Sequence, residues 1–116
     1  WRTRAYTPRP VPDGCAADVA PAARTVVELR AGAVWHTGIS GKWHLSSDGR
    51  TPQSSWPTRR GFDLFFGTLA GCSSYFAPHT LTRGEEPADD AARDGFYYTD
   101  AIADEATAWI CDRSDR

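Results

Sequence analysis

The segment GFDLFFGTLAGCSSYF, residues 61–76, constrains the fold most, because it gathers bulky apolar side chains in one short stretch. These side chains are Phe62, Leu64, Phe65, Phe66, Leu69 and Phe76. The pattern predicts that they pack into a core, and a stacking surface for a ligand is the alternative. At 116 residues the chain has the length of one small domain, and that core must form around this segment.

Residues 22–45 predict a helix followed by a strand. Val26 and Leu29 belong to a short helical pattern that Gly32 can end. The next residues, VWHTGIS at 34–40, are apolar or β-favouring and predict a short strand. A helix that leads into a strand predicts an α/β fold with a sheet flanked by helices.

The clearest helical pattern lies at residues 97–111, YYTDAIADEATAWIC. Its apolar side chains recur at three- and four-residue steps and predict one packed face: Ile102, Ala106, Trp109 and Ile110. Residues 46–60 are rich in Ser, Gly, Pro and Thr, which predicts a loop. Residues 82–95 are acidic and predict a loop or hairpin end with solvated carboxylates, because the spacing of an EF-hand is absent.

Residues 1–21 carry four of the eight prolines and predict an irregular N-terminal segment or a cut edge. The chain contains no methionine, so we expect it to be a piece of a longer protein. The spacing of Cys15, Cys72 and Cys111 fits neither a metal knuckle nor a disulfide-rich scaffold. We expect unpaired thiols, with one disulfide and a spare thiol as the alternative.

Charge and hydropathy exclude several classes of protein. The net charge of −2 gives no general attraction to nucleic acid or anionic membranes, so any anion site must be local. No apolar run approaches the roughly 20 residues that span a bilayer, and no signal peptide opens the chain. We expect a soluble protein that binds no nucleic acid. The compartment is not determined, although the arginine-rich, alanine-rich composition hints at a bacterial source.

The stretch GISGKWHL, residues 38–45, contains the only lysine of the chain. If residues 39–44 are extended, Lys42 and His44 project to one side and Trp43 to the other. A tetrahedral oxyanion would offset their shared positive charge. Lysine offers a compact ammonium, and histidine can give a proton to a leaving oxygen, as ester cleavage requires. The alternative is a surface lysine beside a histidine that caps a strand end, with Trp43 in the core.

Four blocks, GISGKWHL, PTRRGFDLFFG, SYFAPHTLTRGEE and YYTDAIADEATAWI, together resemble the sulfatase family in order and spacing over residues 23–111. The resemblance implies that residues 22–116 form the central part of a sulfatase catalytic domain. It also implies a partial alkaline-phosphatase-like fold, with a mixed sheet between helices and active-site groups at strand ends.

The same resemblance implies hydrolysis of sulfate monoesters by a formylglycine nucleophile, made by a maturation enzyme. Lys42 would neutralise sulfate oxygens, and His44 would bind the sulfate or assist the leaving oxygen. A divalent cation, usually calcium, would be held by ligands outside this chain. Cys15 is not assigned as the nucleophile, because the following AADV lacks the proline and arginine of the family's motif.

Three residues are weaker candidates for substrate contact: Ser73, directly before the third block, and Ser74 and His79 within it. We expect no role for His36 at a strand edge. The arginines at 59–60 are expected to anchor their loop through ion pairs.

Two other classes of function remain open. The chain could be a binding module for a sulfated glycan or another anion, using its arginines and its five tryptophans, Trp1, Trp35, Trp43, Trp56 and Trp109. Burial of Trp43 and Trp109 would oppose this reading. The chain could also be an inactive fragment, and even as part of a sulfatase it is not expected to be active alone.

Overall fold

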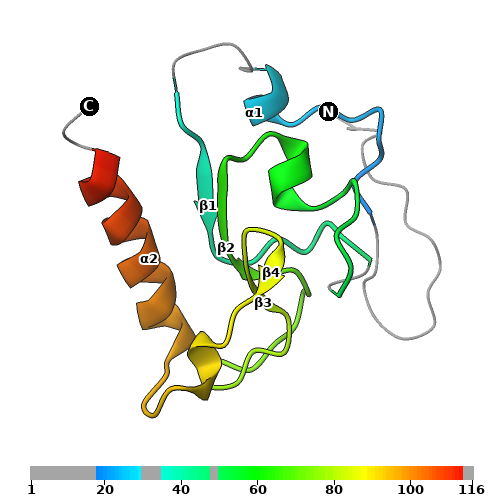
Figure 1. Cartoon of the computed structure of the whole chain (residues 1–116). Helices are drawn as coiled ribbons and strands as arrows, with labels where there is room; N and C mark the ends of the chain where they lie inside the picture. The colour runs from blue at the N-terminus through cyan, green and yellow to red at the C-terminus, as the bar shows by residue number, and fades with distance from the viewer. Residues whose placement is uncertain (1–17, 30–34, 48–49, 114–116) are drawn as a thin grey trace.

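The computed structural model describes residues 18–29, 35–47 and 50–113 (Figure 1). The elements in chain order are α1 (Val26–Leu29), β1 (Gly38–Ser40), the 3-10 helix η1 (Pro57–Arg60), β2 (Leu64–Thr68), β3 (Leu81–Arg83), β4 (Glu86–Pro87), the 3-10 helix η2 (Asp90–Ala92) and α2 (Tyr98–Arg113). The strands form one sheet in the order β1-β2-β3-β4. β1 and β2 are parallel and the other pairs antiparallel, so the predicted mixed α/β architecture is present.

The parallel pair β1–β2 is shorter than the sequence predicts. Gly38 lies opposite Leu64 and Ser40 opposite Phe66, whereas a strand was expected from residue 34. Pairing with the partner segment begins only at Thr37, whose carbonyl accepts from the amide of Leu64 at 3.0 Å. Trp35 precedes this point and is exposed, and residues 30–34 lie outside the described part of the chain.

The sheet carries a separate apolar cluster on each face, because successive side chains of a strand point in opposite directions. Phe65 packs on one face with Trp43, Trp56 and Leu69. The second cluster contains Phe66, Leu81 and Tyr98. The predicted core segment is therefore confirmed for Phe65, Phe66 and Leu69. The expectation was wrong for Phe76, which lies in the loop after β2 and is 67% exposed.

The long helix α2 packs against β1 and confirms the helix predicted at 97–111 (Figure 1). The Ser40 hydroxyl donates to the Ile102 carbonyl at 2.9 Å, and the Tyr98 hydroxyl accepts from the Thr68 amide at 2.8 Å. Ile110 was expected on the packed face but is largely exposed. Successive helical residues lie about 100° apart, so Trp109 faces β1 and Ile110 turns outward.

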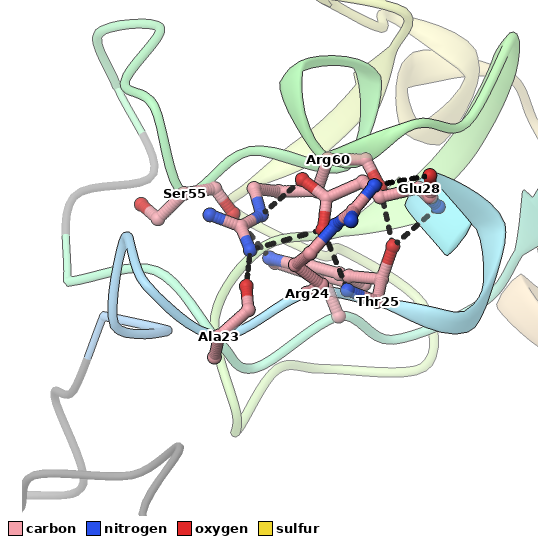
Figure 2. Close-up of polar contacts among 7 residues, drawn as sticks. Ala23, Arg24, Thr25, Glu28, Ser55 and Arg60 are labelled. Atoms are coloured by element: carbon pink, nitrogen blue, oxygen red, sulfur yellow. Dashed lines mark hydrogen bonds and ion pairs between the residues drawn. The ribbon is translucent and has the colours of Figure 1, made fainter. Parts of the chain in front are cut away.

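Arg60 joins α1 to η1 (Figure 2). Its buried guanidinium pairs with Glu28, with Nε 3.2 Å from Oε1, and also donates to the Ala23 carbonyl. The Thr25 hydroxyl donates to the Arg60 carbonyl at 2.8 Å. Arg59 pairs instead with Glu85 at 2.8 Å. Both arginines thus make the predicted ion pairs.

The acidic segment 82–95 forms the hairpin of β3 and β4 followed by η2, and one of its carboxylates is not solvated. Asp90 is 8% exposed and accepts from both terminal nitrogens of Arg83, at 3.0 and 3.2 Å. These hydrogen bonds lower the pKa of Asp90. Arg83 also donates to Glu105 of α2, at 2.8 and 3.1 Å. The sequence pattern missed this burial because it depends on the paired hydrogen bonds from Arg83 of β3.

In the part of the chain that the structure describes, no helix has both the length and the apolar character to cross a membrane.

Candidate functional site

Lys42 and His44 directly follow the carboxyl end of β1. The segment continues along β2: the amide of Gly41 donates to the Phe66 carbonyl at 2.8 Å, and that of Trp43 to the Thr68 carbonyl at 2.9 Å. Because β1 and β2 are parallel, the loop that follows β2, residues 69–80, leaves the sheet at the same edge. All the candidate residues therefore come from segments that follow the carboxyl ends of the parallel pair, where α/β proteins commonly bind ligands.

His44 has a left-handed backbone, with a φ of 57°. It is the one non-glycine residue with a positive φ in the described ranges. Its amide donates to the Leu69 carbonyl at 3.1 Å, and the preceding amide, that of Trp43, donates to the Thr68 carbonyl. Two successive amides therefore point at the end of β2 and the residue that follows it. Lys42 and His44 were expected to share one side because side chains alternate along an extended backbone. That alternation therefore ends at His44. The expectation assumed an extended backbone through residue 44, and that assumption is wrong.

The backbone of Gly71 makes room for the His44 ring. A Cβ at residue 71 would overlap the Nε2, Cε1 and Cδ2 atoms of the imidazole. Only a glycine thus permits this approach, and the loop after β2 fixes one side of the ring. The His44 side chain is half-buried as a result.

The other two residues of the Lys-Trp-His motif, Lys42 and Trp43, have opposite environments. The Lys42 ammonium is exposed and makes no hydrogen bond or ion pair with another residue in the described ranges. Trp43 is buried in the first apolar cluster, and its indole donates to the Ser55 carbonyl at 2.8 Å. The buried Trp43 therefore anchors the loop after β1 next to the exposed Lys42.

The weaker candidates occupy one turn in the loop after β2. The Ser73 hydroxyl lies 3.3 Å from His79 Nδ1 and accepts from the His79 amide at 3.2 Å. The Ser74 hydroxyl accepts from the amides of Phe76 and Ala77, both at 3.1 Å. Ser73 and His79 therefore form a pair, whereas the Ser74 oxygen shapes the turn.

The environments of the tryptophans oppose the anion-binding module. Trp43 and Trp56 are buried, and Trp109 is half-buried against β1. Trp35 is exposed, and Trp1 lies outside the described residues. The described tryptophans thus do not form one exposed face.

Within residues 18–29, 35–47 and 50–113, no three His, Cys, Asp or Glu side chains gather as a metal site needs. The described residues do not fit the divalent cation that the resemblance implies. Cys15 lies outside these ranges, and Cys72 is an exposed thiol in the loop after β2.

The sequence reasoning missed two glycines that shape the site. Gly71 contacts His44, and Gly67 in β2 lies against the Gly41 carbonyl, which a Cβ would overlap. An isolated glycine in a strand pattern is a known sign of a close backbone approach, so Gly67 carried a usable signal. Gly71 carried none, because its neighbour is 27 positions away in the chain.

Comparisons with known proteins point to one kind of enzyme. Scanned against models of protein families, the chain matches none. It is similar to arylsulfatase J of the mouse, Mus musculus, with 45% identity over 42 residues that cover 36% of this chain and 6% of the relative. It is also similar to an uncharacterized sulfatase of Schizosaccharomyces pombe, with 31% identity over 91 residues that cover 66% of this chain and 16% of the relative. The chain thus spans about a sixth or less of these relatives, and the similarity points to the sulfatases over short stretches.

Proposed function

We propose that this chain is the central part of a sulfatase catalytic domain of the alkaline-phosphatase-like class, and that the parent protein hydrolyses sulfate monoesters. Lys42 and His44 contact the sulfate group. The observation that carries the proposal is the left-handed backbone of His44 at the carboxyl end of β1. Such strained positions cluster at active sites and cost about 1–3 kcal/mol. The similarity to two proteins named as sulfatases gives the reaction class.

Lys42 supplies positive charge for the non-bridging oxygens of the sulfate. Its ammonium is exposed and has no carboxylate partner among the residues described, so its charge is available to an anion. Charge builds up on the sulfate oxygens and the leaving oxygen as the S–O bond breaks. A cation already in place stabilises that charge without rearrangement.

His44 donates a proton to the leaving oxygen or a hydrogen bond to a sulfate oxygen. When the bond between sulfur and the ester oxygen breaks, the departing alkoxide needs a proton, and an imidazolium N–H can provide it. The contact with Gly71 and the buried Trp43 limit where the ring can go. A fixed ring favours proton transfer because the donor is already oriented.

The nucleophile and the metal ion belong to other parts of the parent protein in this proposal. The hydrate of a formylglycine made by a maturation enzyme would supply the nucleophilic oxygen, and a divalent cation, calcium in the usual case, would supply positive charge for the sulfate. Residues outside this chain would hold that cation. Ser73, Ser74 and His79 would contact the rest of the substrate.

The test uses the longer protein encoded by the parent reading frame, produced together with a formylglycine-generating enzyme. Hydrolysis of an aryl sulfate is measured for the wild type, Lys42→Ala and His44→Ala. Each substitution should lower kcat about a hundredfold or more, which corresponds to about 3 kcal/mol of transition-state stabilisation.

Matched controls separate the site from general charge effects. His36→Ala removes an exposed histidine before β1, and Arg93→Ala removes an exposed cation after η2. Both should leave kcat within about twofold. Normal rates in the folded Lys42→Ala and His44→Ala variants would overturn the roles given to these two residues.

A further inference from the structure

The residues on either side of His44 are fastened to other parts of the chain. The indole of Trp43 donates to the Ser55 carbonyl at 2.8 Å, and the Leu45 carbonyl accepts from the Val19 amide at 3.0 Å. His44 lies between these two contacts with a φ of 57°, a conformation that a residue with a side chain keeps only when its surroundings enforce it. The contacts on both neighbours therefore help to hold His44 in place.

The carboxylate of Asp18 joins these two contacts. Its Oδ1 accepts from the Ser47 amide at 2.7 Å and from the Ser55 hydroxyl at 3.0 Å. Its Oδ2 accepts from the Ser47 hydroxyl at 2.7 Å. Asp18 directly precedes Val19, and Ser55 provides the carbonyl that binds Trp43. One carboxylate thus ties together the segments that hold the residues before and after His44.

A buried pair of hydroxyls extends the contacts of Asp18. Ser46 and Ser55 are both buried, and their hydroxyl oxygens lie 2.9 Å apart. The Ser55 hydroxyl gives its single proton to Asp18, so the Ser46 hydroxyl is the donor of this pair. Asp18 itself is exposed, so its removal opens no cavity in the core. Its hydrogen bonds are therefore its main contribution to this part of the fold.

We propose that Asp18 is a positioning residue for His44 in the hydrolysis of the sulfate ester. This inference rests on the proposed function. The hydrogen bonds of Asp18 to Ser47 and Ser55 fix the segment that follows His44 and the carbonyl that holds Trp43. A proton donor that is misplaced by about 1 Å can lose a hundredfold in rate, so a group that fixes its backbone contributes to turnover without touching the substrate.

The test measures the hydrolysis of 4-nitrophenyl sulfate by the parent protein, produced with a formylglycine-generating enzyme. Asp18→Ala should lower kcat about tenfold and change KM less than twofold, because it loosens the proton donor without removing a group that binds the substrate. Asp18→Asn should keep kcat within about twofold of the wild type. Its amide oxygen can accept the two hydrogen bonds now made to Oδ1, and its amide nitrogen can donate to the Ser47 hydroxyl.

A double-mutant cycle tests whether Asp18 acts through His44. In a protein that already carries His44→Ala, the further change Asp18→Ala should lower kcat less than twofold, because the ring that Asp18 positions is gone. Asp104→Ala is the matched control, since it removes an exposed carboxylate of α2, and it should change neither kcat nor KM. The melting temperature of every variant is measured alongside its rate.

The outcomes separate this inference from the function on which it rests. A wild type that does not hydrolyse the ester overturns the proposed function and the role of Asp18 together. With an active wild type, a normal kcat in Asp18→Ala overturns the role of Asp18 alone, whether or not the melting temperature falls. An equal loss in Asp18→Asn, or a tenfold loss that persists in the His44→Ala background, overturns it as well.

Discussion

The imidazole of His44 packs directly on the backbone of Gly71, so closely that a Cβ at residue 71 would overlap three of its ring atoms. The two residues come from different segments, one after β1 and one after β2. Their contact couples the position of the proposed proton donor to the conformation of a loop. A change at Gly71 should therefore act on the reaction through His44.

Gly71→Ala should lower kcat of the parent protein for an aryl sulfate by about a hundredfold with little loss of stability. The added methyl group displaces a side-chain ring, which can move, and a displacement of about 1 Å is enough for a loss of that size. Rates and melting temperature are measured together. Gly84→Ala is the control, because a Cβ there meets nothing within 4 Å, and it should leave kcat unchanged. A normal rate in Gly71→Ala would show that the position of His44 is irrelevant to turnover.

Gly67→Ala should lower the free energy of unfolding by roughly 3 kcal/mol or more. The new Cβ would overlap the carbonyl of Gly41, and backbone atoms on paired segments cannot move apart without breaking their hydrogen bonds. Urea denaturation followed by circular dichroism measures the change. Gly41→Ala is the matched control: its φ of 139° brings strain, but its Cβ meets no atom within 4 Å. Equal losses in the two variants would refute the role of the close approach.

Arg83→Ala should lower the free energy of unfolding by roughly 1–3 kcal/mol, because it leaves the buried Asp90 without its main partner, although Arg93 stays 3.4 Å away. Arg83 also binds Glu105 and stacks on Phe66, with 4.8 Å from the guanidinium carbon to the ring centroid. Arg83→Lys should recover only part of the loss, since an ammonium cannot make both paired contacts. Chemical denaturation checks this series. A fully stable Arg83→Lys variant would show that charge alone suffices.

Glu85→Gln should reduce stability at pH 7 by about 1 kcal/mol or less, because its partner Arg59 is exposed. Hydrogen bonds from Arg59 and Thr58 lower the pKa of Glu85 from 4.5 to about 2. A lowered pKa contributes stability above the unfolded value, and this contribution fades as the pH falls from 4.5 towards 2.

The difference in unfolding free energy between wild type and Glu85→Gln should therefore shrink over that pH window. Melting temperatures at pH 7, 4 and 2.5 test it. Glu86→Gln removes the neighbouring carboxylate, which has no ion-pair partner in the described ranges, and should show a smaller difference at pH 7. A constant difference for Glu85→Gln at all three values would contradict the pairing.

The sequence by itself determined the elements whose patterns are local. The three- and four-residue steps of α2 and the apolar run of β2 specify a helix and a buried strand, because side-chain periodicity depends only on neighbours in the chain. The alternation of Phe65 and Phe66 follows from the strand as well. The one lysine of the chain, followed by a tryptophan and a histidine, also marks residues 42–44 as a candidate site from the sequence alone.

The tertiary structure decided what distant segments do to each other. The backbone of His44 is left-handed in the segment that follows β1, and the ring of His44 meets Gly71. Asp90 is buried and accepts hydrogen bonds from Arg83. Phe76 and Phe65 are both phenylalanines of the apolar segment 61–76, and the sequence predicts burial for both. Phe76 nevertheless lies past the end of β2 and is exposed beside Tyr97. The sequence shows which side chains are apolar, but the pairing of strands decides which of these side chains are buried in the core.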